Sequence, residues 1–108
     1  MSKVTTTTTG VGTTETTIYT CPSGKETTVY RFSTTGKEDI TALKISYYNS
    51  SSNSTIDLIK NGVLNSGDTI SYISNSNTLI MNTGDYLSVL SEVDSSVDII
   101  ITYEETDA

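Results

Sequence analysis

The chain has 108 residues, of which 34% are hydrophobic, and its 13 acidic and 6 basic side chains give a net charge of −7. This length holds one domain with a thin core, and a chain this acidic, with no basic stripe, is repelled by phosphate backbones, so nucleic acid is not an expected partner. The sequence contains no histidine, which excludes imidazole as a metal ligand or a catalytic base.

The first segment, "MSKVTTTTTGVGTT" (1–14), is of low complexity and has no apolar period. We expect a flexible Thr-rich N-terminal arm over 1–14, followed by a β-sandwich domain over 15–108. A second interpretation stays open, because Thr runs suit added strands: the arm orders against the sheet of a neighbouring subunit. Val4, Thr7 and Val11 are then candidate interface residues. The segment has no apolar stretch typical of a signal peptide, so we expect synthesis in a cytosol and no membrane partner.

Eight short segments with alternating polar and apolar residues follow, separated by turn-forming residues. This spacing predicts an all-β fold, a single antiparallel β-sandwich of about eight short strands of jelly-roll or immunoglobulin-like type. No segment of ten residues or more keeps a helical period, and no alternation of strands with helices suggests a parallel sheet. The predicted strands cover residues 16–21, 27–33, 41–49, 55–60, 69–74, 78–82, 86–91 and 97–103.

Two connections between these segments have the signature of hairpins. Asn61 and Gly62 both tolerate a positive φ, which predicts a tight turn at that point. The stretch "GDYLSVLSEVDSSVDIIITYEE" (84–105) has two alternating runs around a short polar break, which predicts a strand, a turn and a second strand. Ile100 is apolar on the phase that should face water, so we expect another strand, the arm or a neighbouring subunit to cover it.

No combination of residues in the sequence points to catalysis, a cofactor or a metal. Without histidine, no imidazole can activate the many hydroxyl groups, and "GVG" (10–12) lacks the lysine of a phosphate-binding loop. We expect Cys21, at a predicted strand end beside Pro22, to be an inert and partly buried thiol. The acidic C-terminal residues are interpreted as a solvated, self-repelling edge rather than a Ca²⁺ site, because they lack the spacing of a calcium loop. The chain is therefore not expected to be an enzyme.

Tyrosine supplies most of the aromatic side chains, and two tyrosines lie off the apolar phase of their strands. Tyr48 and Tyr86, beside Asn49 and Asp85, are therefore candidates for an exposed protein-binding or sugar-binding surface.

Three stretches together resemble small β-sandwich structural proteins of tailed bacteriophages. They are "TTIYTCPSGKETTVYRFS" (16–33), "YYNSSSNSTIDLIKNG" (47–62) and "TGDYLSVLSEVDSSVDIIITYEE" (83–105). The likeness is one of pattern and covers roughly residues 16–105. Cys21 departs from it, because an aliphatic or small residue is expected there.

The resemblance implies a virion protein, most simply a head decoration or cement protein. Such a protein would bind the major capsid protein on the outer surface of the head, would be made in the host cytoplasm, and would form a homotrimer that stabilises the shell. The alternative is a neck or tail fibre component, or a receptor-binding module that takes a glycan. The candidate interface residues are Val4, Thr7, Val11, Tyr48, Tyr86 and Ile100.

Overall fold

The computed structural model describes residues 3–74 and 76–108, and in these ranges the chain is all-β. The predicted antiparallel sandwich is confirmed, with nine strands. All eight segments predicted from the alternating pattern are strands, and the ninth lies in the Thr-rich N-terminal segment. The strands are β1 (Val4–Val11), β2 (Thr16–Thr20), β3 (Lys25–Gly36), β4 (Ile40–Asn49), β5 (Ser54–Leu64), β6 (Thr69–Ile73), β7 (Leu79–Asn82), β8 (Tyr86–Leu90) and β9 (Val97–Asp107).

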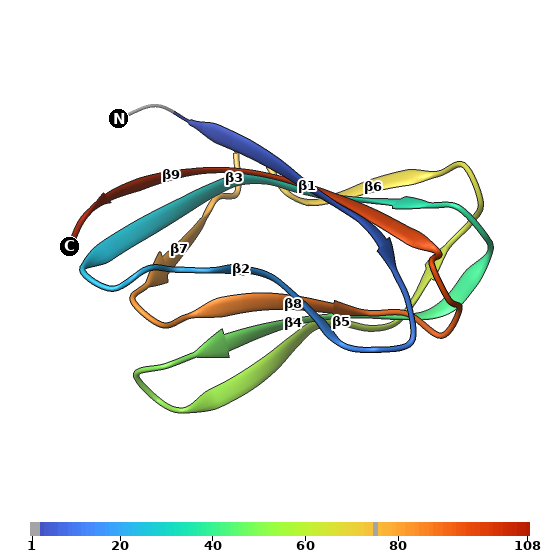
Figure 1. The fold of residues 1–108 in the computed structure, drawn as a ribbon, viewed down its shortest axis with the longest axis horizontal. Helices are drawn as coiled ribbons and strands as arrows, with labels where there is room; N and C mark the ends of the chain where they lie inside the picture. The colour runs from blue at the N-terminus through green and yellow to red at the C-terminus, as the bar shows by residue number, and fades with distance from the viewer. Residues whose placement is uncertain (1–2, 75) are drawn as a thin grey trace.

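The strands form two packed sheets, seen as two layers in Figure 1. One sheet has the order β1-β9-β3-β6, with β7 pairing the other end of β3, and we call it the five-stranded sheet. The other has the order β2-β8-β4-β5, and we call it the four-stranded sheet. The first strand pairs with the last, and most connections cross between the sheets. This interleaved order is that of a jelly roll, one of the two sandwich types predicted.

The N-terminal segment is the first place where the structure differs from prediction. Instead of a flexible arm, Val4–Val11 forms β1, an edge strand antiparallel to β9, with Thr7 opposite Ile100. Figure 1 shows β1 running beside the terminal strand. Threonine is β-branched and favours extended backbone, so a Thr run forms a strand wherever a partner is available. The sequence did not predict this strand, because consecutive threonines show no alternation of polar and apolar residues. Met1 and Ser2, also predicted as part of the arm, lie outside the described residues.

The core lies between the sheets and follows the period-2 pattern of the strands. Phe32 in β3 is fully buried, and so are Leu43 and Ile45 in β4, which belongs to the opposite sheet. The remaining buried apolar residues are Val11, Cys21, Val29, Ile40, Leu64, Ile73, Met81, Leu87, Val89, Val97, Ile99 and Ile101. No helix among the described residues is long and apolar enough to cross a membrane.

The two predicted hairpins are both wrong in their pairing. β8 and β9 are strands, as expected, but β8 pairs with β2 and β4 whereas β9 pairs with β1 and β3, so the connection between them crosses from one sheet to the other. The backbone of that crossing is tied to the N-terminal segment, where Ser91 N–H donates to Gly12 O and Ser96 N–H donates to Val11 O. Alternation predicts that a strand exists but not which neighbour it takes.

The Asn61-Gly62 pair is a bulge inside β5 and not a turn. Asn61 has a φ of 58°, as the motif suggested, but β5 continues through it and stays paired with β4, with a register shift at this point. A Cβ at Gly62 would lie 3.0 Å from Ile59 Cδ1 and 3.3 Å from Leu43 O, so the packing here is tight and favours glycine. The turn between β4 and β5 falls earlier, where Asn53 has a φ of 51°. Residues that favour a positive φ therefore indicate a bulge as well as a turn, because both need that backbone conformation.

Candidate interaction surfaces

The edge of the five-stranded sheet holds three of the six candidate interface residues. Val4 is 44% exposed at the start of β1, Thr7 is exposed, and Ile100 is half-buried on β9 between Thr7 and Ser33 of β3. The cover expected over Ile100 thus comes in part from strand β1. Val11 differs from the prediction: it is only 2% exposed, so it belongs to the core and is not accessible to a partner.

β1 presents a free edge with little protection against further pairing. Its sequence, VTTTTTGV, contains no charged residue and no proline, two of the features with which sheet edges are blunted. A register shift, which is a third such feature, lies at the end of the strand between Thr8 and Val11. One side of β1 pairs with β9, where the hydroxyl groups of Thr5 and Thr102 lie 2.9 Å apart. Among the described residues no strand pairs with its other side. The backbone groups on that side can therefore accept another strand.

Tyr48 and Tyr86 form a second surface, on the four-stranded sheet. They lie opposite each other on β4 and β8 with their ring centroids 4.8 Å apart and an interplanar angle of 22°. Tyr48 Oη donates to Asn53 Oδ1 at 2.6 Å. Because each ring turns one face to the other, the pair stabilises the pairing of the two strands. The six candidate residues thus lie on two different sheets and do not form one site.

Asp85, the neighbour of the candidate Tyr86 in the sequence, is fully buried. Its carboxylate accepts hydrogen bonds from Tyr47 Oη, from Ser50 N and Oγ at 2.8 and 2.9 Å, and from Asn82 N at 2.9 Å. Asn49 Oδ1 is likewise used locally and accepts from Ser51 N at 3.0 Å. We call Asp85 with Tyr47, Ser50 and Asn82 the Asp85 corner. It joins β4, β7 and β8 and is structural.

The hydrogen bonds of this corner set the titration of its two ionisable groups. Burial raises the pKa of Asp85, but the hydrogen bonds from Tyr47, Ser50 and Asn82 outweigh it and hold the pKa below its ordinary value of 3.8. Burial also raises the pKa of Tyr47 far above 10.0, and the bond to Asp85 raises it further. At neutral pH the corner therefore consists of a carboxylate and a neutral phenol.

The acidic residues near the C-terminus are dispersed and bonded, not gathered on one solvated edge. Glu92 accepts from Thr41, Asp94 from Thr13, Asp98 from Gly10 N, Glu104 from Tyr30, Glu105 from Tyr19 and Asp107 from Lys25. Within the described ranges no three metal-ligating side chains come together. These acids thus act mainly as acceptors that tie strands and loops to one another.

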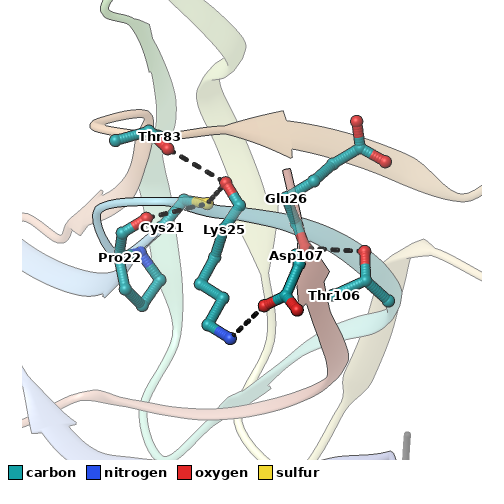
Figure 2. A network of polar contacts seen from close by, with 7 residues as sticks. All are labelled: Cys21, Pro22, Lys25, Glu26, Thr83, Thr106 and Asp107. Atoms are coloured by element: carbon teal, nitrogen blue, oxygen red, sulfur yellow. Dashed lines mark hydrogen bonds and ion pairs between the residues drawn. The ribbon is translucent and has the colours of Figure 1, made fainter.

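Cys21 is 1% exposed and sits under the turn that joins β2 and β3 (Figure 2). Its thiol donates to Lys25 O at 3.3 Å, and it accepts a hydrogen bond from Thr27 Oγ1, also at 3.3 Å. Figure 2 also shows Thr83 Oγ1 reaching Lys25 O from the start of the turn after β7. The prediction of a buried thiol agrees with this environment, in which a reagent or a second cysteine cannot reach the sulfur without opening the turn.

A groove at the open side of the sandwich was not foreseen from the sequence. It has a volume of about 280 Å³ between β5 and the β6–β7 region, and its lining includes Leu58, Tyr72, Ile73 and Leu79. Leu58 is 45% exposed and its neighbour Ile56 is 56% exposed. Two large apolar side chains in this half of β5 are therefore accessible to solvent.

Comparison with known proteins gives a likeness of fold and no family. No protein-family model and no curated protein sequence matches the chain. Among solved structures, a chain from Bacillus endospore appendages, described as a novel family of disulfide-linked pili, is similar with a TM-score of 0.54. The similarity covers 98% of this chain and 85% of that chain at 13% sequence identity. At this identity the comparison establishes a shared fold and nothing about activity.

Proposed function

We propose that this chain is a non-catalytic structural subunit of a multi-copy assembly, and that its β1 edge is one of the surfaces through which copies or partner proteins associate. The observation that carries the proposal is the unprotected edge of β1, eight residues long without a charge or a proline. Pairing along such an edge uses backbone hydrogen bonds, which gives affinity with little demand on the side chains. Val4, Thr7 and Ile100 lie at or beside this edge and would contribute side-chain contacts.

The likeness of fold to a chain of disulfide-linked pili supports a structural role, because pili are assemblies of many copies. The mode of linkage would differ. The related structure is described as disulfide-linked, whereas the one cysteine of this sequence is buried beneath the β2–β3 turn. Association of this chain would therefore be non-covalent, through edge pairing and apolar contacts.

In its finer form the proposal is a bacteriophage virion protein, specifically a head decoration or cement protein. The resemblance of residues 16–105 to phage β-sandwich proteins supports it, and so does the net charge of −7, which suits a protein outside the shell and away from the genome. The chain would act as a homotrimer that binds the major capsid protein. Apolar burial stabilises by about 25 cal/mol per Å², so modest contacts repeated around a shell would strengthen it.

The location of the protein in particles tests this proposal directly. Particles from cells that produce the protein are separated on a density gradient, labelled with antibody to the chain and examined by electron microscopy. Label on the head surface supports the decoration role, and label on fibres or filaments supports only the coarser structural role. Protein found solely in the unassembled fraction would overturn both.

The role of the β1 edge is tested by placing a charge on it. Thr7→Lys introduces the kind of residue that natural edges use against pairing, while Thr14→Lys makes the same change of charge in the loop after β1, where the side chain is exposed. We expect Thr7→Lys to remove self-association or partner binding in analytical ultracentrifugation and Thr14→Lys to preserve it. Equal behaviour of the two variants would contradict a role for the edge.

The second candidate is a fibre or receptor-binding module that takes a glycan, favoured by the stacked pair of Tyr48 and Tyr86 on the outer face of the four-stranded sheet. In this role Tyr48→Ala would lower glycan binding without changing the oligomeric state. A glycan array on which the wild-type protein gives no signal would count against it.

A further inference from the structure

Strand β3 is irregular on both sides at one place on the outer face of the five-stranded sheet. On the β9 side the register shifts between Val29 and Arg31, and on the other side it shifts between Phe32 and Ser33, beside β6. β7 pairs with β3 only up to Val29, so neither β6 nor β7 pairs with Tyr30 or Arg31. Bulges of this kind are frequent where a side chain is redirected toward a site.

The consequence of the bulge is that two consecutive side chains share one face. Val29 and Phe32 are both fully buried, while Tyr30 is half-buried and Arg31 is exposed between them. A regular strand would send one of the two middle residues into the core. Here Tyr30 and Arg31 both line a cavity of about 340 Å³ on the outer face.

Most of the groups around this cavity carry hydrogen-bond donors. Its lining also contains Ile73, and the polar members are Lys3, Tyr30, Arg31, Ser71, Ser74 and Thr102. Lys3 Nζ lies 4.1 Å from the centroid of the Tyr30 ring, which holds the ammonium group at the rim. In the described ranges the only hydrogen bond found for the Arg31 guanidinium runs from Nε to Ser33 Oγ at 2.9 Å. Its terminal nitrogens therefore remain for water or a ligand.

The cavity is a local exception to the charge of the protein. The chain has 13 acidic side chains for 6 basic ones, and Lys25, Lys37 and Lys44 each pair with a carboxylate. In the part of the chain that the structure describes, Lys3 and Arg31 have no carboxylate within 4.0 Å. In an excess of acids, two unpaired cations facing one cavity mark a site for an external anion.

We propose that this cavity, which we call the β3 bulge pocket, binds an acidic monosaccharide unit through its carboxylate. The guanidinium of Arg31 is the main partner of the carboxylate, because its planar donors match that group, and Lys3 adds a second charge. The hydroxyl groups of Ser71, Ser74 and Thr102 each pair with one protein hydroxyl, those of Ser33, Ser76 and Thr5. A hydroxyl has one donor and two acceptor sites, so each keeps capacity for a sugar hydroxyl. The volume is that of a small ligand site.

The surroundings select for a ligand with one charge. Glu104 lies next to the pocket and accepts a hydrogen bond from Tyr30 Oη at 3.3 Å, and the protein as a whole is strongly acidic. Nucleic acids and other dense polyanions are repelled by such a field. A single carboxylate close to Arg31 and Lys3 gains the local attraction with little of that repulsion.

The test is ligand binding measured by calorimetry and by amide chemical shifts in NMR. The probes are D-glucuronate and N-acetylneuraminate, with D-glucose and D-glucuronamide as neutral matches and inorganic sulfate as a bare oxyanion. We expect the acidic sugars to bind and to shift the amides of Tyr30, Arg31, Ser71 and Thr102. Shifts confined to other regions, or equal affinity for neutral and acidic sugars, would overturn the proposal. Sulfate that binds as tightly as the sugars would overturn the sugar part.

Variants locate the interaction and provide a matched control. Arg31→Gln and Lys3→Gln should each weaken binding, the first by at least about tenfold, as expected for loss of a charge-assisted contact. Lys60 on β5 also has no carboxylate within 4.0 Å among the described residues, so Lys60→Gln changes the net charge equally but far from the pocket and should leave the affinity unchanged. An equal loss of affinity in all three variants would show that only the net charge matters, and it would refute the site. The NMR shifts of the wild-type protein decide the matter if Arg31→Gln does not fold.

Discussion

The Asp85 corner and the β1 edge are made of similar polar residues and do opposite things. In the corner, a fully buried carboxylate joins three strands through hydrogen bonds from Tyr47, Ser50 and Asn82. Along β1, threonines stand mostly in solvent and the strand pairs on one side only. An unmet hydrogen bond costs far more free energy in the interior than in water. Polar side chains therefore stabilise the fold where they are buried, and they leave a surface for association where they are exposed.

The largest effect should come from removing the carboxylate of the corner. Asp85→Ala leaves Tyr47 Oη and the N–H groups of Ser50 and Asn82 buried without their acceptor. We expect a loss of about 3–5 kcal/mol in the free energy of unfolding, measured by urea denaturation. Glu38→Ala, at an exposed acid in the loop between β3 and β4, should change it by no more than about 0.5 kcal/mol. A similar loss of stability in both variants would show that the Asp85 corner contributes no more to stability than an exposed acid does.

Lowering the pH should reduce the contribution of the Asp85 carboxylate to the free energy of unfolding. Because the pKa of Asp85 is lower in the folded protein than its ordinary 3.8, the unfolded state takes up protons first as the pH falls. The stabilisation is thus complete above the unfolded pKa and is lost as the pH falls through the folded pKa. Between pH 5 and pH 3, in roughly the range set by a carboxyl of this type, the wild type should lose more stability than Asp85→Asn. Parallel pH profiles would contradict this assignment.

Deleting β1 up to Thr9 should lower the stability less than removing the Asp85 carboxylate, although it removes more residues. A chain that starts at Gly10 keeps the bond from Gly10 N to Asp98 and the buried Val11 and loses mainly exposed threonines. We expect a decrease of about 1–3 kcal/mol in the free energy of unfolding, from backbone pairs of modest net strength. The same variant should lose the association that β1 supports. If the shortened chain associates fully, the β1 edge is not the surface through which the copies associate.

The smallest effect is expected for the stacked tyrosines. A double-mutant cycle with Tyr48→Ala and Tyr86→Ala should give a coupling energy of about 0.5–1.5 kcal/mol, the range for aromatic pairs across strands. The matched cycle with Thr5→Ala and Thr102→Ala tests the exposed hydroxyl pair of β1 and β9, which should couple less. A larger coupling in the threonine pair would contradict the expected ranking of aromatic over hydroxyl contacts at the surface.

The comparison also shows how far the sequence leads. Strand positions followed from alternation, since a strand with one face on the core must place its apolar residues at every second position. Pairing did not follow: β8 and β9 alternate clearly and yet belong to different sheets. Asn61-Gly62 shows the same limit, because a positive φ serves a bulge as well as a turn.

The candidate residues were harder to predict than the strands. Asp85 precedes Tyr86 in the sequence, but in the turn between β7 and β8 it is fully buried. Val11 and Thr7 belong to one strand, and only the crossing after β8 determines that Val11 is enclosed. Tyr30 and Arg31 gave no signal in the sequence, because a bulge that turns both to one face depends on the partners of β3. The burial of a single residue thus depends on which strands pair and pack together, and the alternation of polar and apolar residues does not predict this.

The pairing of the first strand with the last has a consequence for how the protein is made. β9 lies between β1 and β3 in the five-stranded sheet, so this sheet lacks an interior strand until the last eleven residues of β9 have left the ribosome. Contacts so distant in sequence form slowly, typically in milliseconds to seconds for such β folds. A chain cut short before β9 would leave β1 and one side of β3 without a partner strand. Closure of the five-stranded sheet therefore waits for the synthesis of β9.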